Sequence, residues 1–467
     1  MKKYMILAVA GLLMSSCGVY NKYERPEVDT KGLIRDAISD ADTLFVAPED
    51  TASFGNLPWR AVFTDPQLQA LIEQGLEKNA NLQNAVLTVQ MYETMLKAAK
   101  LAFLPAITFG GAQAQMGSIN TVYTDPSVTT KSYQFPLTAS WTLDLFGNIL
   151  SQKRSTQMKL LGFKDYQMAV RAQVIGGIAN SYYTLLMLDE QLRIVTDMSK
   201  MAKETWDIMK MQHQLGRMRS TSVQSAEASY YSILAQKATI KQQIREMENS
   251  MSLLLNEAGH TIARGQFYNQ SLPSNFATGV GIQLLSNRAD VHAAEMALAQ
   301  CFYDTETARS RFYPNITITG TALFTNSLGT AIVNPGKWIL SAVGSLTQPI
   351  FQHGQIVAGL KVAKAQQEQA LNTFQQTILK AGNEVSNALV AYNTCDEKSQ
   401  LDEKQVKIYE QNVEDTRQLY TSKGSSYLEV IQAQTGLLNA RISKVQDDFS
   451  KMQAVVNLYQ ALGGGSR

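Results

Sequence analysis

Proline is scarce in this chain and unevenly placed. The 467 residues include 11 prolines, with none between Pro136 and Pro273 and none after Pro349. Proline breaks helix interiors, so both proline-free intervals can form uninterrupted helices. Alanine, glutamine, lysine, leucine and methionine, which are good helix formers, fill these intervals. The chain is therefore predicted to be mainly α-helical, with very long helices.

Long apolar runs and charge imbalance are also lacking. Beyond the N-terminus no run of about 18 apolar residues occurs, so no membrane-spanning helix is expected. The formal net charge is only +2, and acidic and basic residues are interspersed. Nothing in this balance indicates a nucleic-acid partner.

Side chains that commonly carry catalysis are few. No glycine loop that could hold a phosphate opens a helix, and the histidines show no metal-ligand spacing. Cys301 and Cys395 fall in helical patterns, where packed free thiols are expected and a disulfide is the alternative. The predictions are therefore no enzymatic activity, no metal site and no cofactor. The four histidines, far apart in sequence, are His213, His260, His292 and His353.

The N-terminus has the pattern of a secretory signal. Two lysines precede an apolar stretch, and small residues and Cys17 follow it. The segment ending at Cys17 is similar to a bacterial lipobox, in which the cysteine is acylated, for example with palmitate, and becomes the mature N-terminus. An ordinary signal peptide is the alternative. We expect residues 1–16 to be a lipoprotein signal peptide and residues 17–60 an extended tail anchored in lipid.

One stretch, residues 132–145, alternates between apolar and polar side chains. Successive side chains of a strand point to opposite faces, so this segment has one apolar and one polar face. Its length suits a tilted strand across a bilayer, which needs ~9–11 residues. A half-buried strand of a soluble sheet is the alternative. The side chains predicted to face lipid are Tyr133, Phe135, Leu137, Trp141 and Leu143.

The chain repeats one plan twice. Phe103 opens a Phe-Leu-Pro junction between a helical and a strand pattern, and Phe312 opens a Phe-Tyr-Pro junction 209 residues later. Two further pairs stand at matching points: Phe146 and Phe351, 205 residues apart, and Gly216 and Gly424, 208 apart. These near-equal offsets indicate a duplicated unit, with repeats at 61–260 and 280–463.

Each repeat is predicted to run helix, strand, loop, strand, long helix, turn, helix. The predicted strands are 105–116, 132–145, 315–325 and 338–348. The predicted helices are 64–100, 149–215, 221–257, 283–312, 355–422 and 427–462.

Four strands with an apolar face cannot stand alone in a bilayer. Open sheet edges in lipid cost several kcal/mol per unsatisfied backbone group, so only closed barrels persist there. Known membrane barrels start at about eight strands. The chain must therefore borrow strands from copies of itself, although this argument does not set the number of copies.

Together these features resemble the TolC-type outer-membrane efflux proteins, particularly the lipidated branch that serves resistance–nodulation–division pumps. The resemblance rests on Cys17, on the two Phe-x-Pro junctions and on two segments, Trp-Thr-Leu-Asp-Leu-Phe-Gly at 141–147 and Leu-Glu-Val-Ile-Gln-Ala-Gln at 428–434. It implies a homotrimer in which a twelve-stranded β-barrel in the outer membrane continues into a twelve-helix periplasmic α-barrel.

The resemblance also implies a function. The chain would be a passive exit duct for drugs or other small toxic compounds, delivered by an inner-membrane resistance–nodulation–division transporter through a periplasmic adaptor (membrane fusion) protein. Two alternatives stay open from the sequence: a lipid-anchored periplasmic helical scaffold, and a duct for metal ions.

The family's tunnel closes at a periplasmic helical turn, which corresponds here to residues 420–429. Tyr420 matches a gate tyrosine of the family and Glu429 the first of two acids, whereas Gln432 replaces the second acid. Lys423 lies near the position of a basic residue. The resemblance thus implies a gate built from these four residues. The alternative places Glu429 on an ordinary solvated helix face.

Overall fold

The computed structural model describes residues 21–28, 54–111, 113–119, 128–273, 288–327, 337–421 and 427–466. They belong to two compact units. The first falls within Met1–Glu27, Thr88–Lys164 and Ala293–Gln375, and the second within Val28–Leu87, Asp165–His292 and Gln376–Arg467. Cys17 and Lys423 lie outside the described residues. No described helix combines the length and apolar composition needed to cross a bilayer.

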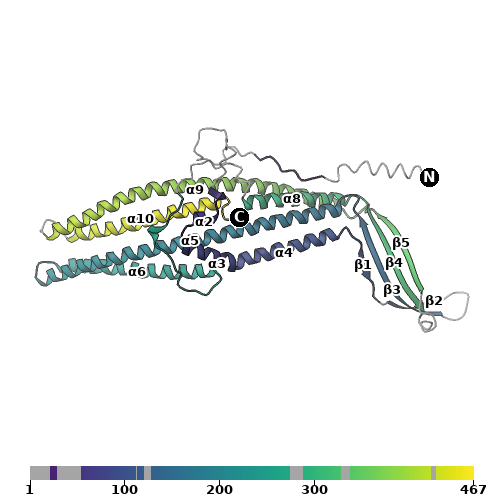
Figure 1. The fold of residues 1–467 in the computed structure, drawn as a ribbon, viewed down its shortest axis with the longest axis horizontal. Coiled ribbons are helices and arrows are strands. Elements are labelled where there is room, and N and C mark those ends of the chain that lie inside the picture. Colours follow the sequence, from purple (N-terminus) through teal and green to yellow (C-terminus); the bar gives the residue numbers. More distant parts are fainter. Residues whose placement is uncertain are drawn as a thin grey trace. The chain divides into compact units, whose positions relative to one another are not determined.

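Six of the helices form three pairs of equal length (Figure 1). Helices α4 (Ala80–Leu101) and α8 (Ala289–Ser310) have 22 residues each. Helices α5 (Asn148–Gln214) and α9 (Gln355–Thr421) have 67 each, and α6 (Ser220–Leu254) and α10 (Tyr427–Ala461) have 35 each. The four predicted helices after the strands lie within three residues of these bounds.

The second halves of the two copies match at an offset that the sequence pattern missed. Helices α5 and α9 begin 207 residues apart (355 − 148 = 207). Gly147 and Gly354, each directly before its helix, have φ of 68° and 77°, a left-handed conformation that favours glycine. Pairing Phe146 with Phe351 at 205 residues is therefore wrong by two positions, because the left-handed glycine sets the register.

The single helix predicted over 64–100 is wrong. The structure has α3 (Pro66–Lys78) and α4, separated by Asn79. The Asn79 side chain accepts hydrogen bonds from the backbone N–H groups of Asn81 (3.0 Å) and Leu82 (3.1 Å). It also donates to the Leu254 carbonyl at 2.8 Å. A buried asparagine thus caps the new helix, which is a common role for this residue type.

The strands form one antiparallel sheet in the order β1-β3-β4-β5, with β2 also paired to β3. Their bounds are β1 Ala106–Phe109, β2 Gln113–Ile119, β3 Val128–Leu143, β4 Asn315–Ser327 and β5 Lys337–Thr347. The continuous strand predicted over 105–116 is wrong. Gly111 there has φ of 74°, and a Cβ on Gly110 would meet the Pro136 ring at 2.8 Å.

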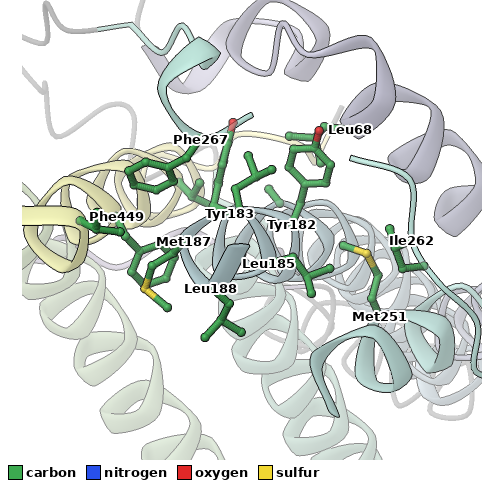
Figure 2. Close-up of a cluster of buried hydrophobic side chains, with 14 of the residues drawn as sticks. Leu68, Tyr182, Tyr183, Leu185, Met187, Leu188, Met251, Ile262, Phe267 and Phe449 are labelled. Atoms are coloured by element: carbon green, nitrogen blue, oxygen red, sulfur yellow. The ribbon is translucent and has the colours of Figure 1, made fainter. Parts of the chain in front are cut away.

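The second unit has a large apolar core built around α5 (Figure 2). Tyr182, Tyr183 and Leu185 of α5 are almost fully buried. Leu68 of α3 and Phe449 of α10 belong to the same cluster. Each such side chain contributes ~1.5–3 kcal/mol through burial. Packing of amphipathic faces, rather than helix propensity alone, therefore holds the middle of the long helices in place.

Shorter elements complete the second unit. They are α2 (Trp59–Val62) and the 3₁₀ turns η2 (Phe54–Asn56) and η3 (Phe267–Asn269). The segment that follows α6 is fastened by Arg264, which is 2.9 Å from Asp189 and 2.8 Å from Glu248. Hydrogen bonds to these acids raise the pKa of the Arg264 guanidinium, which stays charged.

Candidate functional site

Strand pairing gathers apolar side chains on one face of the sheet. Residues opposite each other in paired strands share a face. One row of partners contains Phe109, Leu137, Ala322 and Leu340. A parallel row contains Leu143, Ile316 and Leu346. The alternation predicted for one strand thus extends across β1, β3, β4 and β5.

The opposite face is lined by hydroxyl groups. One row contains Thr108, Thr138, Thr321 and Ser341, and another Thr142, Thr317 and Ser345. In the second row the Thr142 and Thr317 hydroxyl oxygens are 3.5 Å apart, and the Ser345 hydroxyl donates to the Thr317 carbonyl at 3.2 Å. Such a face is compatible with water, whereas the apolar face is not.

Three of the predicted lipid-facing side chains can be located on the apolar face. Leu137 is 44% exposed and Trp141 40% exposed in the single chain, and Leu143 is partly buried. Tyr133 and Phe135 belong to β3, but their side chains lie outside the described part. The Trp141 indole donates from Nε1 to the Phe103 carbonyl at 3.0 Å, near the end of β3. A tryptophan with its polar atom at a strand end is typical of a membrane interface.

The junction between β3 and α5 is fixed by a carboxylate. Asp144, predicted as part of the strand, instead lies beyond β3 and accepts hydrogen bonds from the backbone N–H groups of Ile149 (3.1 Å) and Leu150 (2.7 Å). Its charge also complements the positive end of the helix dipole. Phe146 stacks on Tyr313, with ring centres 4.9 Å apart. A cleft of about 370 Å³ lies at this junction.

The predicted gate residues lie at the ends of α9 and α10. Tyr420, in the last turn of α9, is half-buried, and burial raises the pKa of its hydroxyl. Glu429 is exposed in the first turn of α10, and Gln432 is exposed one turn later. The structure thus places three of the four predicted residues near this helix end, in one copy of the chain.

Two contacts behind these helix ends were not predicted from the sequence. Gln434 of α10 donates to the Thr205 hydroxyl of α5 at 3.0 Å. Arg417 of α9 forms an ion pair with Glu204 of α5 at 3.6 Å. These contacts tie the α9–α10 hairpin to the α5–α6 hairpin. Only the fold could reveal them, because their partners are more than 200 residues apart.

Further from the turn, α9 and α10 are joined by carboxylates and lysines. Lys398 is 2.5 Å from Asp447, and Lys444 is 2.7 Å from Asp448. Burial, together with a hydrogen bond to Asp447 and its charge, raises the pKa of Asp402. The helix pair therefore contains an acid that favours its neutral form.

The remaining reactive groups have structural surroundings. Cys301 and Cys395 are free, partly buried thiols, and burial raises the pKa of both. His292 Nδ1 is 2.6 Å from the buried Asp165 carboxylate. Within the described ranges, no group of three or more His, Cys, Asp or Glu side chains is arranged to hold a metal ion.

The sequence model for outer membrane efflux proteins matches residues 71–257 and again residues 281–464. The chain belongs to this family. The predicted resemblance, the outer-membrane location and the efflux function are thereby confirmed. The family's members are transport proteins, in line with the prediction that this chain is not an enzyme.

Individual relatives are similar along nearly the whole chain. The cation efflux system protein CusC of Escherichia coli O157:H7 is 24% identical over 97% of both chains. The toluene efflux pump outer membrane protein TtgC of Pseudomonas putida is 25% identical over 99% of this chain and 96% of its own. The probable outer membrane lipoprotein SilC of Salmonella typhimurium is 24% identical over 88% of this chain and 89% of its own.

The fold of this family member is similar to that of a solved channel. The outer-membrane channel OprN superposes with a TM-score of 0.85 at 22% identity, covering 96% of this chain and 98% of that one. The coarse fold prediction, long helices with a smaller sheet, is confirmed.

Proposed function

We propose that this chain is the outer-membrane channel of a tripartite efflux system and acts as a passive exit duct for small toxic compounds. The observation that carries the proposal is the two-faced sheet. An apolar face that crosses four strands suits contact with lipid, and a hydroxyl-lined face suits a water-filled passage. No chemical step is needed for this role, only a continuous wet path.

The sheet requires partner subunits for this role. β1 and β5 are its two edges, and unpaired edges are not stable in lipid. We propose a homotrimer, in which the strands of three chains close a twelve-stranded β-barrel and the long helices form a twelve-helix periplasmic α-barrel. The family resemblance supports the number three.

The partners follow from the same proposal. A periplasmic adaptor and an inner-membrane resistance–nodulation–division transporter would deliver the compounds, and Cys17 would carry the acyl chains that anchor residues 17–60. Tyr420, Lys423, Glu429 and Gln432 would form the periplasmic gate. Three Glu429 carboxylates around an axis would favour cations there and would repel each other.

The relatives differ in cargo. CusC is described as a cation efflux protein and TtgC as part of a toluene pump, so both organic compounds and metal ions are candidate substrates. A wide duct with a hydroxyl-lined face does not by itself select between them. We propose that the pump and adaptor set the substrate range.

The experiment that tests the channel role uses Cys17→Ser protein, which lacks the lipid anchor. We expect it still to require detergent for extraction and to have the mass of a trimer, measured by light scattering with the detergent contribution subtracted. A variant that is soluble and monomeric without detergent would instead support the helical scaffold.

A further inference from the structure

The first unit contains a seam between the two copies of the repeat, which we call the internal seam. It joins α5 to α8 and β3 to β4. On the helices, the Ser155 hydroxyl donates to the Asp304 carboxylate at 2.6 Å, and Asn148 donates to the Ser310 hydroxyl at 2.8 Å. Here the second strand and long helix of copy one meet the first helix and strand of copy two.

The mirror-order surfaces have no counterpart within the described part of the chain. The second strand and long helix of copy two are β5 and α9, and the first helix and strand of copy one are α4 and β1. β5 and β1 are the two edges of the sheet. Both surfaces also expose large apolar side chains, which a soluble surface rarely gathers in this way.

Because the paired helices have equal lengths, each contact of the internal seam can be transferred to the second surface. Position 155 of α5 corresponds to Val362 of α9 (155 + 207 = 362), and position 304 of α8 to Met95 of α4 (304 − 209 = 95). Val362 is 56% exposed and Met95 52% exposed. The polar pair inside the chain thus becomes a pair of exposed apolar residues.

A second transferred pair behaves in the same way. Leu143 of β3 pairs with Ile316 of β4 inside the chain. The same offsets lead to Ile350, just beyond β5, and to Ile107 of β1. These side chains are 97% and 72% exposed. Burial of such residues against each other is favourable by ~25 cal/mol per Å² of apolar surface.

We propose that the occupant of this surface is a second copy of the chain, bound in the geometry of the internal seam. α9 and β5 of one subunit pack on α4 and β1 of the next, with Val362 against Met95 and Ile350 near Ile107. The proposal rests on the channel function and adds the residues of the subunit interface. Inside the chain the seam is polar at this level, and between chains it is apolar.

Disulfide trapping tests the proposal in full-length protein purified in detergent. In a Cys301→Ser, Cys395→Ser background, Val362→Cys combined with Met95→Cys should form disulfides between chains, because internal-seam geometry brings such positions within reach of each other. Non-reducing gels should show dimer and trimer bands. Each single-cysteine variant should stay monomeric on the gel. Ser155→Cys with Asp304→Cys is the matched control and should link only within one chain.

The outcomes separate this proposal from the channel function. A protein that light scattering shows to be trimeric, but whose Val362 and Met95 cysteines do not link chains, would overturn the seam and leave the channel intact. A protein that is monomeric in detergent would overturn both. A charge pair gives an independent reading: Val362→Glu or Met95→Lys alone should reduce the trimer fraction severalfold, and the double variant should restore it.

Discussion

At the scale of residues, single polar side chains decide where the long helices begin. Asn79 divides a predicted helix in two, and Asp144 ends a predicted strand by capping α5. Both act through backbone N–H groups that a helix start leaves without partners. The sequence contains both residues, but the hydrophobic pattern continues across them. Their roles therefore became visible only with the hydrogen bonds.

Arg264 provides a test of buried charge. Replacing it with alanine should lower the free energy of unfolding by about 3–5 kcal/mol, because Glu248 would remain buried without its cation. Arg193→Ala is the matched control, since Arg193 is 61% exposed beside Glu190 and should cost less than about 1 kcal/mol. Chemical denaturation in detergent measures both. Equal losses for the two variants would contradict the account of Arg264.

Asp402 predicts a dependence of stability on pH. Its raised pKa means that the folded state favours the protonated form. Its contribution to stability is therefore complete below the ordinary pKa of Asp, ~3.9, and is lost as the pH rises through the raised value. Asparagine stays neutral throughout, so Asp402→Asn should match the wild type near pH 4 and melt at a higher temperature at pH 7.

The control for this prediction is Asp415→Asn, an exposed position of the same helix. It should show no such divergence between acid and neutral pH. Thermal unfolding followed by circular dichroism across this range makes the comparison. A wild type that melts above Asp402→Asn at pH 7 would show that the carboxylate is favoured there.

At the scale of elements, most of the fold was predictable. The helices after the strands follow from apolar periodicity and from the lack of proline, and their observed bounds differ from prediction by at most three residues. The strand interruption at Gly110 and Gly111 was not predicted, because it depends on the close approach of Pro136 from another strand. Contacts between hairpins, such as Gln434 with Thr205, were likewise beyond a local pattern.

The orientation of β3 can be tested with arginine. Leu137 lies in the middle of the paired part of β3, whereas Leu143 is its last residue. Arginine facing lipid costs about 2–4 kcal/mol near mid-membrane and about 0–1 near the interface. Leu137→Arg should therefore reduce the assembled fraction strongly and Leu143→Arg only slightly.

Thr138→Arg is the control for the opposite face. Thr138 shares a row with Thr108 and Thr321 on the hydroxyl-lined face, so arginine there should be tolerated. The assembled fraction in outer-membrane extracts is the measurement. If Leu137→Arg and Thr138→Arg assemble equally well, the assignment of the two faces is wrong.

The end of the α9–α10 hairpin should control leakage. Tyr420→Ala combined with Glu429→Ala removes a half-buried ring and a charge from the proposed gate. We expect cells that express this variant to become severalfold more sensitive to a large hydrophilic antibiotic. Glu414→Ala, at an exposed position of α9, is the control. Unchanged sensitivity of the double variant would remove these two residues from the gate.

At the scale of the whole molecule, duplication explains the architecture. Two copies with helices of 22, 67 and 35 residues each supply part of a ring that one chain cannot close. The need for several subunits follows from the open sheet edges. The number three came from the family resemblance, because strand chemistry alone allows other numbers.

Conductance in a planar lipid bilayer tests the central claim most directly. The full-length protein, reconstituted without pump or adaptor, should produce discrete steps of passive ionic current, and the Tyr420→Ala, Glu429→Ala variant should raise the open fraction. A baseline current for both proteins, when the insertion of trimers into the bilayer has been verified, would contradict the channel.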